Sequence, residues 1–150
     1  EAMSMQEWID TKLKHTAFDS AYFGNELVMN DKDEVIQRLD YLLIISLDAT
    51  IEETIDAIHS HHGSAVLAHA AGRTNSICVQ LGFIPKNLPY DAIEVKKIED
   101  MTYIKKIHPW ITDENTLWLM DSDAHRLVDI HEQDHSITDE AFRKLWSRNL

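Results

Sequence analysis

The residues best suited to chemistry are His69, Asp123 and His125, each of which follows a short apolar run. Asp123 and His125 form an Asp-x-His pair, and residues i and i+2 of an extended segment point to the same side. The two side chains can therefore meet at one ligand, and a carboxylate with an imidazole favours zinc, manganese or iron over calcium. The alternative interpretation is a turn-capping aspartate beside hydrogen-bonded loop histidines.

Arg73 is the candidate for substrate binding, because a guanidinium four residues after His69 could hold a phosphate. The alternative for Arg73 is a surface salt bridge. Three other histidines, at 59, 61 and 62, lie where a helix is expected to end. The helix dipole favours imidazolium there, so we interpret them as solvated capping residues. No residue is assigned as nucleophile or general acid, because the sequence has neither a GxSxG nor an HExxH motif.

Three short strand-like segments are the elements expected to position these side chains, and Ala65–Ala68 has the unalternating apolar pattern of a strand buried on both faces. We expect Ala65–Ala68, Ile93–Val95 and Leu117–Met120 to be neighbouring parallel strands, with a helix over Ile51–His62 packed outside them. Ligand sites of parallel sheets lie beyond the carboxyl ends of the strands, which is where the candidate ligands stand. The sequence thus predicts an α/β fold with His69 and the Asp-x-His pair at one end of its sheet.

The remaining segments give weaker signals. Apolar residues recur at helical spacing over 1–13, and a second amphipathic helix is expected after Thr138. His15–Leu43 is expected to be irregular, with a polar turn at Asn30–Asp33. Gly63 is expected to take a positive φ after the helix that precedes it.

Composition narrows the class of protein. The 150 residues include 26 Asp and Glu against 14 Lys and Arg, a net charge of −12, which argues against general binding to nucleic acid or an anionic membrane. The longest apolar stretch is far shorter than the roughly 20 residues of a membrane span. Cys78 is the one cysteine, so no internal disulfide forms, and a cytoplasmic location is expected. Nine histidines among many carboxylates suit a divalent-metal site.

Several blocks resemble the polymerase and histidinol phosphatase (PHP) family of metal-dependent phosphoesterases. The helix and strand leading to Ala68-His69 are similar to a block of that family that ends in Ala-His-Pro. Asp91–Val95 is similar to its Asp-Gly-Ile-Glu-Val strand, and Ser122–His125 matches its Ser-Asp-Ala-His motif. Further similarity to a bacterial subgroup lies at Phe23–Leu27, Asn75–Ile77 and Leu81–Lys86.

The resemblance implies a distorted seven-stranded β/α barrel, similar to a TIM barrel, with two or three metal ions at the carboxyl ends of its strands. It implies hydrolysis of phosphate esters of small molecules or nucleotides by a metal-bound hydroxide. By the resemblance His69, Asp123 and His125 are metal ligands of zinc, manganese or iron, and Arg73 lies near the phosphate.

The chain also departs from the family pattern. The family's initial His-x-His motif is not found, and the subgroup's Ala-His-x-Asp-Arg has an altered spacing at 68–73. We therefore expect residues 1–150 to be a single domain, the C-terminal portion of a PHP barrel without its N-terminal strands, with an incomplete metal site. Either the missing half completes a phosphoesterase, or the chain is a non-catalytic remnant that self-associates as a binding or scaffold module, most simply as a dimer.

Overall fold

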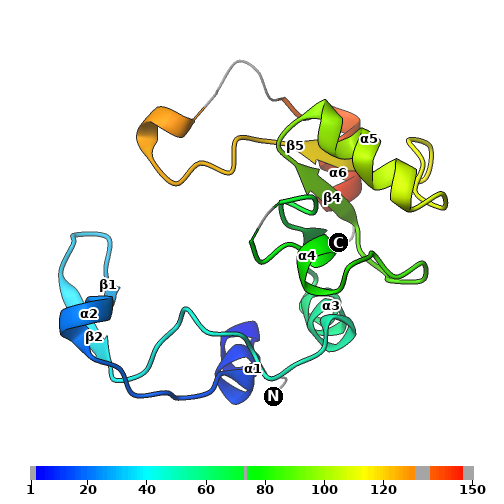
Figure 1. Cartoon of the computed structure of the whole chain (residues 1–150). Coiled ribbons are helices and arrows are strands. Elements are labelled where there is room, and N and C mark those ends of the chain that lie inside the picture. Colours follow the sequence, from blue (N-terminus) through cyan, green and yellow to red (C-terminus); the bar gives the residue numbers. More distant parts are fainter. Residues whose placement is uncertain (1–2, 73, 131–135, 147–150) are drawn as a thin grey trace. The chain divides into compact units, whose positions relative to one another are not determined.

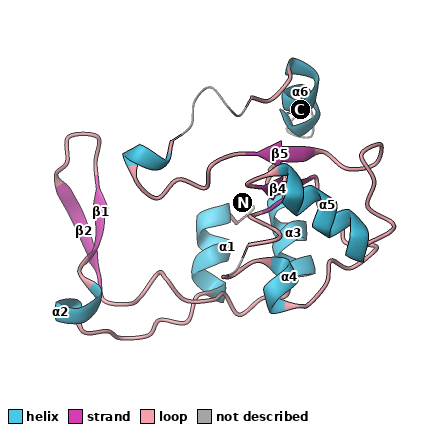
Figure 2. Cartoon of the chain, turned by 45° about the horizontal axis from the view of Figure 1, so that its top comes forward, coloured by secondary structure: helices cyan, strands magenta, loops and turns pink. Residues whose placement is uncertain are grey.

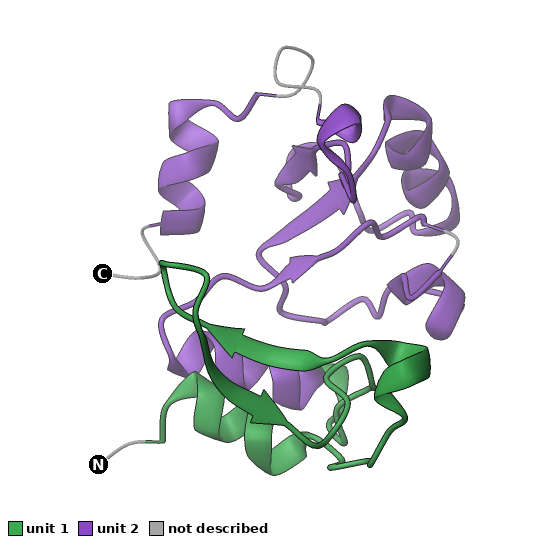
Figure 3. Cartoon of the chain, turned by 90° about the vertical axis from the view of Figure 1, so that its left-hand side faces the viewer, with its two compact units in different colours: residues 1–51 green, residues 52–150 purple. Residues whose placement is uncertain are grey.

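The computed structural model describes residues 3–72, 74–130 and 136–146. The chain divides into two compact units, residues 1–51 and 52–150 (Figure 3). Each unit has its own sheet: two antiparallel strands in the first and three parallel strands in the second. The expected α/β class is therefore confirmed at the level of secondary structure. That residues 1–150 form one domain stays a prediction.

The first unit contains two helices and a β-hairpin. Its elements are α1 (Met5–Lys12), α2 (Ser20–Phe23), β1 (Glu26–Met29) and β2 (Val35–Leu39). Helix α1 confirms the predicted N-terminal helix, and it begins with a capping box in which Ser4 and Glu7 bond each other's backbone N–H groups.

The expectation that His15–Leu43 is irregular was wrong. Strands β1 and β2 pair antiparallel from Glu26↔Leu39 to Met29↔Val35, with a bulge at Val28/Met29. Asn30 Oδ1 shapes the intervening turn by accepting the N–H groups of Lys32 and Glu34. The pattern was missed because both strands are largely exposed, so their apolar residues do not alternate with polar ones as on a half-buried sheet.

The second unit is built on the parallel sheet that the sequence predicted. Strands β3 (Val66–Leu67), β4 (Ala92–Val95) and β5 (Trp118–Met120) lie in the order β3-β4-β5, and the last two are labelled in Figure 1. The pairing runs Val66↔Ala92 between the first two strands and Ile93↔Trp118 to Val95↔Met120 between the last two. Central strand β4 is the most buried of the three.

Within the described residues, several helices accompany this sheet (Figure 2). They are α3 (Ile51–Ser60), α4 (Ile77–Gln80), α5 (Ile98–Ile107), the 3₁₀ helix η1 (Leu127–Asp129) and α6 (Asp139–Trp146). Helix α3 buries Ile55 and Ala57, and α5 packs against β4 and buries Ile104. Thr138 accepts the N–H of Ala141 and so caps α6 as the sequence predicted.

The chain leaves α3 in a way that corrects one expectation. His62, not Gly63, adopts the positive φ of 61°. Gly63 is needed for space instead, because a Cβ there would lie 2.8 Å from Ile58 Cγ2. The left-handed residue at the helix end is therefore one position earlier than expected, and Gly63 is required for a close approach rather than for a positive φ.

The described residues form no closed barrel, since their sheets have two and three strands. Over the same residues, no helix has both the length and the apolar character that crossing a bilayer demands.

Candidate functional site

A cavity of about 680 Å³ lies at the carboxyl ends of β3, β4 and β5. Its lining residues come from the segments that follow the three strands: His69, Ala71, Gly72, Thr74, Asn75, Lys96, Lys97, Asp100, Asp123 and His125. All three side chains predicted as metal ligands, His69, Asp123 and His125, are among them. Arg73, the predicted phosphate-binding residue, lies outside the described residues.

The turn after β3 holds His69 from two sides. Its backbone N–H donates to Glu94 Oε1 at 3.1 Å, and the next N–H, of Ala70, donates to the Glu94 carbonyl at 2.9 Å. The imidazole lies against Gly72, where a Cβ would be 3.2 Å from His69 Nδ1 and 2.8 Å from the His69 carbonyl oxygen. Nδ1 is buried and has no hydrogen-bond partner among the described residues. The sheet and a glycine thus fix an imidazole with an unused ring nitrogen.

The segment after β5 brings Asp123 to the same cavity. Asp123 has a φ of 46°, and its N–H donates to Asp121 Oδ1 at 2.8 Å. Residues with a short polar side chain tolerate this left-handed conformation. His69 is also left-handed, with a φ of 31°. Two of the candidate ligands therefore sit in sparsely populated backbone conformations, which cluster at functional sites.

The Asp123 carboxylate already has charged neighbours. Lys96 Nζ lies 2.8 Å from Asp123 Oδ2, and His125 Nε2 lies 3.4 Å from Oδ1. The hydrogen bond from Lys96 lowers the pKa of the Asp123 carboxyl, and the charges of Lys96, His69 and His125 lower it further. The same hydrogen bond raises the pKa of Lys96. The arrangement stabilises an ionised aspartate beside a protonated lysine.

The side chains present fit a divalent ion in their chemistry. Two imidazoles and a carboxylate are donors that zinc, manganese and iron accept, and the unpartnered Nδ1 of His69 is consistent with such a role. Their arrangement differs from a formed site. Across the described segments, no three His, Cys, Asp or Glu side chains are grouped closely enough to hold an ion, and an ammonium group stands on Asp123 Oδ2.

Sequence reasoning missed Lys96 and Glu94. Glu94 holds the backbone of His69, and Lys96 pairs with Asp123. Lys96 is the first residue after β4, so the strand-end rule that selected the candidate ligands would have found it. Its partner Asp123 is 27 residues away, so the sequence around Lys96 gives no signal of the ion pair.

The histidines near the end of α3 have structural roles. His59 Nε2 lies 2.8 Å from Asp91 Oδ2, an oxygen that also accepts the Ala65 N–H at 2.7 Å. The Asp91 side chain is only 4% exposed, so interpreting His59 as a solvated cap was wrong. His61 does cap the helix, since its Nδ1 lies 2.7 Å from the carbonyl oxygen of Ala57.

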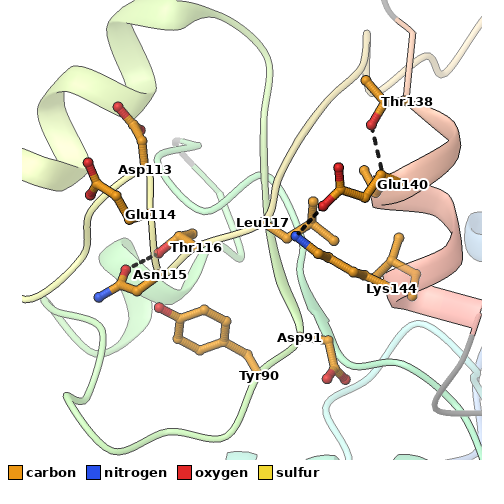
Figure 4. Close-up of a pocket in the computed structure, with 12 residues that line it drawn as sticks. Tyr90, Asp91, Asp113, Glu114, Asn115, Thr116, Leu117, Thr138, Glu140 and Lys144 are labelled. Atoms are coloured by element: carbon orange, nitrogen blue, oxygen red, sulfur yellow. Dashed lines mark hydrogen bonds and ion pairs between the residues drawn. The ribbon is translucent and has the colours of Figure 1, made fainter.

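A second cavity, of about 580 Å³, lies at the opposite end of the sheet, before β4 and β5 (Figure 4). Tyr90 and Asp91 line it from the β4 side, and Glu140 and Lys144 of α6 form an ion pair on another wall. Burial raises the pKa of the Tyr90 hydroxyl. Most of its charged side chains are acidic, and it lies at the amino ends of the strands, away from the candidate ligands.

Comparison of the chain with protein-family models, with curated proteins and with solved structures found no match in any of the three.

Proposed function

We propose that residues 52–150 supply part of the active site of a metal-dependent phosphoesterase that acts on a phosphorylated small molecule or nucleotide. One observation carries the proposal: His69, Asp123 and His125, three donors separated by up to 56 residues in sequence, line one cavity at the carboxyl ends of parallel strands. On this proposal the sheet β3-β4-β5 is a portion of a PHP-type barrel.

The roles of the residues follow from their chemistry. His69 and Asp123, positioned by the turns after β3 and β5, would hold a divalent ion. The exposed His125 would be the third ligand of that ion. When bound, zinc, manganese or iron supplies Lewis-acid activation of a phosphoryl group. A structural zinc shell needs four donors and a two-metal centre needs more, so three donors make an incomplete site. The remaining ligands would come from another polypeptide segment that completes such a barrel or from a second copy.

Binding of Mn²⁺ to the 150-residue chain, followed through the electron paramagnetic resonance of the free ion, tests the proposal. We expect weak binding that is lost in His125→Ala, a side chain 84% exposed and therefore dispensable for folding. The matched control is His62→Asn, which removes another exposed imidazole and places at φ 61° a residue that tolerates it. Equal binding by both variants would contradict the proposal.

Hydrolysis of 4-nitrophenyl phosphate gives a second readout. We expect little or no turnover from the 150-residue chain, even with manganese or zinc, because the shell is incomplete. Turnover should appear when a polypeptide that carries the family's His-x-His motif is fused to this chain. Efficient turnover by the chain alone, as a monomer, would show that the site is complete without further ligands.

A second candidate is a self-associating binding module without catalysis. The observation that favours it is the open sheet: among the described residues, β3 and β5 each pair on one side only. Unpaired edges invite pairing with another strand. Light scattering across a dilution series distinguishes the two candidates, since a module of this kind would be a dimer that binds no Mn²⁺, whereas a stable monomer excludes it.

A further inference from the structure

We propose that Lys96 exchanges partners in this cavity: its ammonium pairs with Asp123 while no ion is bound, and pairs with the phosphate of the substrate once an ion takes that carboxylate. The inference rests on the proposed function of the cavity. It assigns to Lys96 a regulatory and substrate-positioning role that couples the binding of metal to the binding of phosphate.

The sheet itself sets up the competition. Lys96 directly follows β4, Asp123 lies three residues beyond β5, and the two strands pair in parallel up to Val95↔Met120. The strand ends thus deliver both side chains to one place, where Nζ and Oδ2 are 2.8 Å apart. An ion that binds Asp123 must either displace Lys96 or remain close to its positive charge, and both cost affinity.

Lys96 is suited to leave Asp123. Its side chain is 48% exposed and flexible, whereas Asp123 is 23% exposed and its backbone is fixed by Asp121. An ammonium with three rotatable donors binds phosphate as a point charge. Other hydrogen-bonding groups, from Thr74 and Asn75, line the same cavity. A phosphate bound there would give the displaced ammonium a new partner without moving the backbone of β4.

Thermodynamic linkage makes the consequence measurable. If phosphate draws Lys96 from Asp123, phosphate raises the affinity for metal, and metal raises the affinity for phosphate by the same factor. Removal of the Lys96 charge should then strengthen metal binding in the absence of phosphate and weaken the effect that phosphate has on it.

The test uses the 150-residue chain, Mn²⁺ measured as above, and inorganic phosphate as the anion. We expect Lys96→Met to bind Mn²⁺ about tenfold more tightly than the wild type without phosphate, the order expected for removing one nearby charge. Added phosphate should strengthen Mn²⁺ binding several-fold in the wild type and clearly less in Lys96→Met. Two controls isolate the ion pair. Lys96→Arg keeps the charge and should behave nearly as the wild type, and Lys97→Met, which removes a charge from the same cavity other than the one paired with Asp123, should strengthen Mn²⁺ binding clearly less than Lys96→Met does.

The outcomes separate this inference from the proposed function. Mn²⁺ binding that His125→Ala abolishes but Lys96→Met leaves unchanged or weakens would overturn the exchange and leave the metal site standing. An equal gain in Lys96→Met and Lys97→Met would overturn it as well, because the effect would then be general charge removal. If no variant binds Mn²⁺, the proposed function and the exchange both fail.

Discussion

The two compact units differ in how they are held together. Among the described residues, the buried apolar side chains of the first unit are Leu13 and Leu42, while those of the second unit are more numerous and include Ile93 and Val95 of β4 and Ile104 of α5. The hairpin of the first unit leaves large apolar residues such as Met29 and Ile36 exposed. Its residues are held by hydrogen bonds, including the capping box of α1, the turn at Asn30 and the pairing of β1 with β2.

This difference teaches where a binding site can be positioned accurately. An isolated two-stranded hairpin is marginally stable, because it cannot bury a face. In the second unit the side chains of Ile93 and Val95 of β4 are fully buried. Glu94, between them, accepts the backbone N–H of the candidate ligand His69. The cavity is therefore supported by a well-packed core, which precise placement of ligand groups requires.

The largest expected effect is the loss of a core side chain from the second unit. Ile93→Ala removes a fully buried side chain from the central strand and should lower the free energy of unfolding by about 2–5 kcal/mol. The matched change in the hairpin, Ile36→Ala, should alter it by less than about 0.5 kcal/mol, because Ile36 is exposed. Urea unfolding measures both. Similar values for the two variants would mean that the units are equally well packed.

A second comparison uses one histidine from each unit. His108 is fully buried, accepts the Ile84 N–H at Nε2 (2.7 Å) and lies with Nδ1 3.0 Å from the Ile104 carbonyl oxygen. His108→Leu leaves the Ile84 N–H buried without its acceptor, which should cost about 1–3 kcal/mol of unfolding free energy. His15 is stacked on Tyr41 in the first unit and half exposed, so His15→Ala should cost clearly less in the same assay. A larger loss in the His15 variant would reverse the comparison.

Two glycines sharpen the contrast between packing and local conformation. Gly72→Ala places a Cβ against the His69 carbonyl and ring, so we expect changed chemical shifts of the His69 imidazole and a cost of about 1 kcal/mol or more. Gly24 has a φ of 84° and a ψ of −165° with open space around it, so Gly24→Ala should cost about 1–3 kcal/mol through backbone strain alone. Unchanged His69 resonances in Gly72→Ala would contradict the packing seen at the cavity.

The smallest expected effect concerns pH and helix α1. Hydrogen bonds from the Ser4 backbone and side chain lower the pKa of Glu7 below its ordinary value. A depressed pKa means that this contribution to stability is fully present above the unfolded pKa of about 4.5 and is lost as pH falls through the folded value. Helicity of α1 measured by NMR should therefore decline on acidification, and Ser4→Ala should lessen the pH dependence. A pH-independent helix would show that the capping box does not form in solution.

Much of the second unit could be predicted from the sequence. The runs at 65–68 and 117–120 are short, apolar and not alternating, which is the pattern expected of strands buried on both faces. In the structure these runs contain β3 and β5, which lie on either side of β4. Because parallel strands end at a common edge, the placement of His69 and Asp123 around one cavity followed from the same pattern. Whether these residues bind a metal stays a prediction.

The hairpin of the first unit could not be predicted in the same way. Exposed strands carry no burial constraint, so residues 26–39 show no period that distinguishes them from a loop. His59 was misinterpreted for a related reason, since its partner Asp91 is 32 residues away and its burial depends on packing that the sequence does not display.

The sequence by itself determined α3, α6 and the three strands of the second unit, because the spacing of apolar residues within each segment carries that information, whereas α4, α5 and η1 were not predicted. Only the tertiary structure decided that Lys96 meets Asp123, that Gly72 makes room for the His69 ring, and that His62 rather than Gly63 takes the left-handed turn. The physical reason is distance along the chain and local space. Lys96 and Asp123 are 27 residues apart and follow two neighbouring strands, so their ion pair depends on the register of the sheet. What a glycine is needed for depends on which atom lies where its Cβ would be.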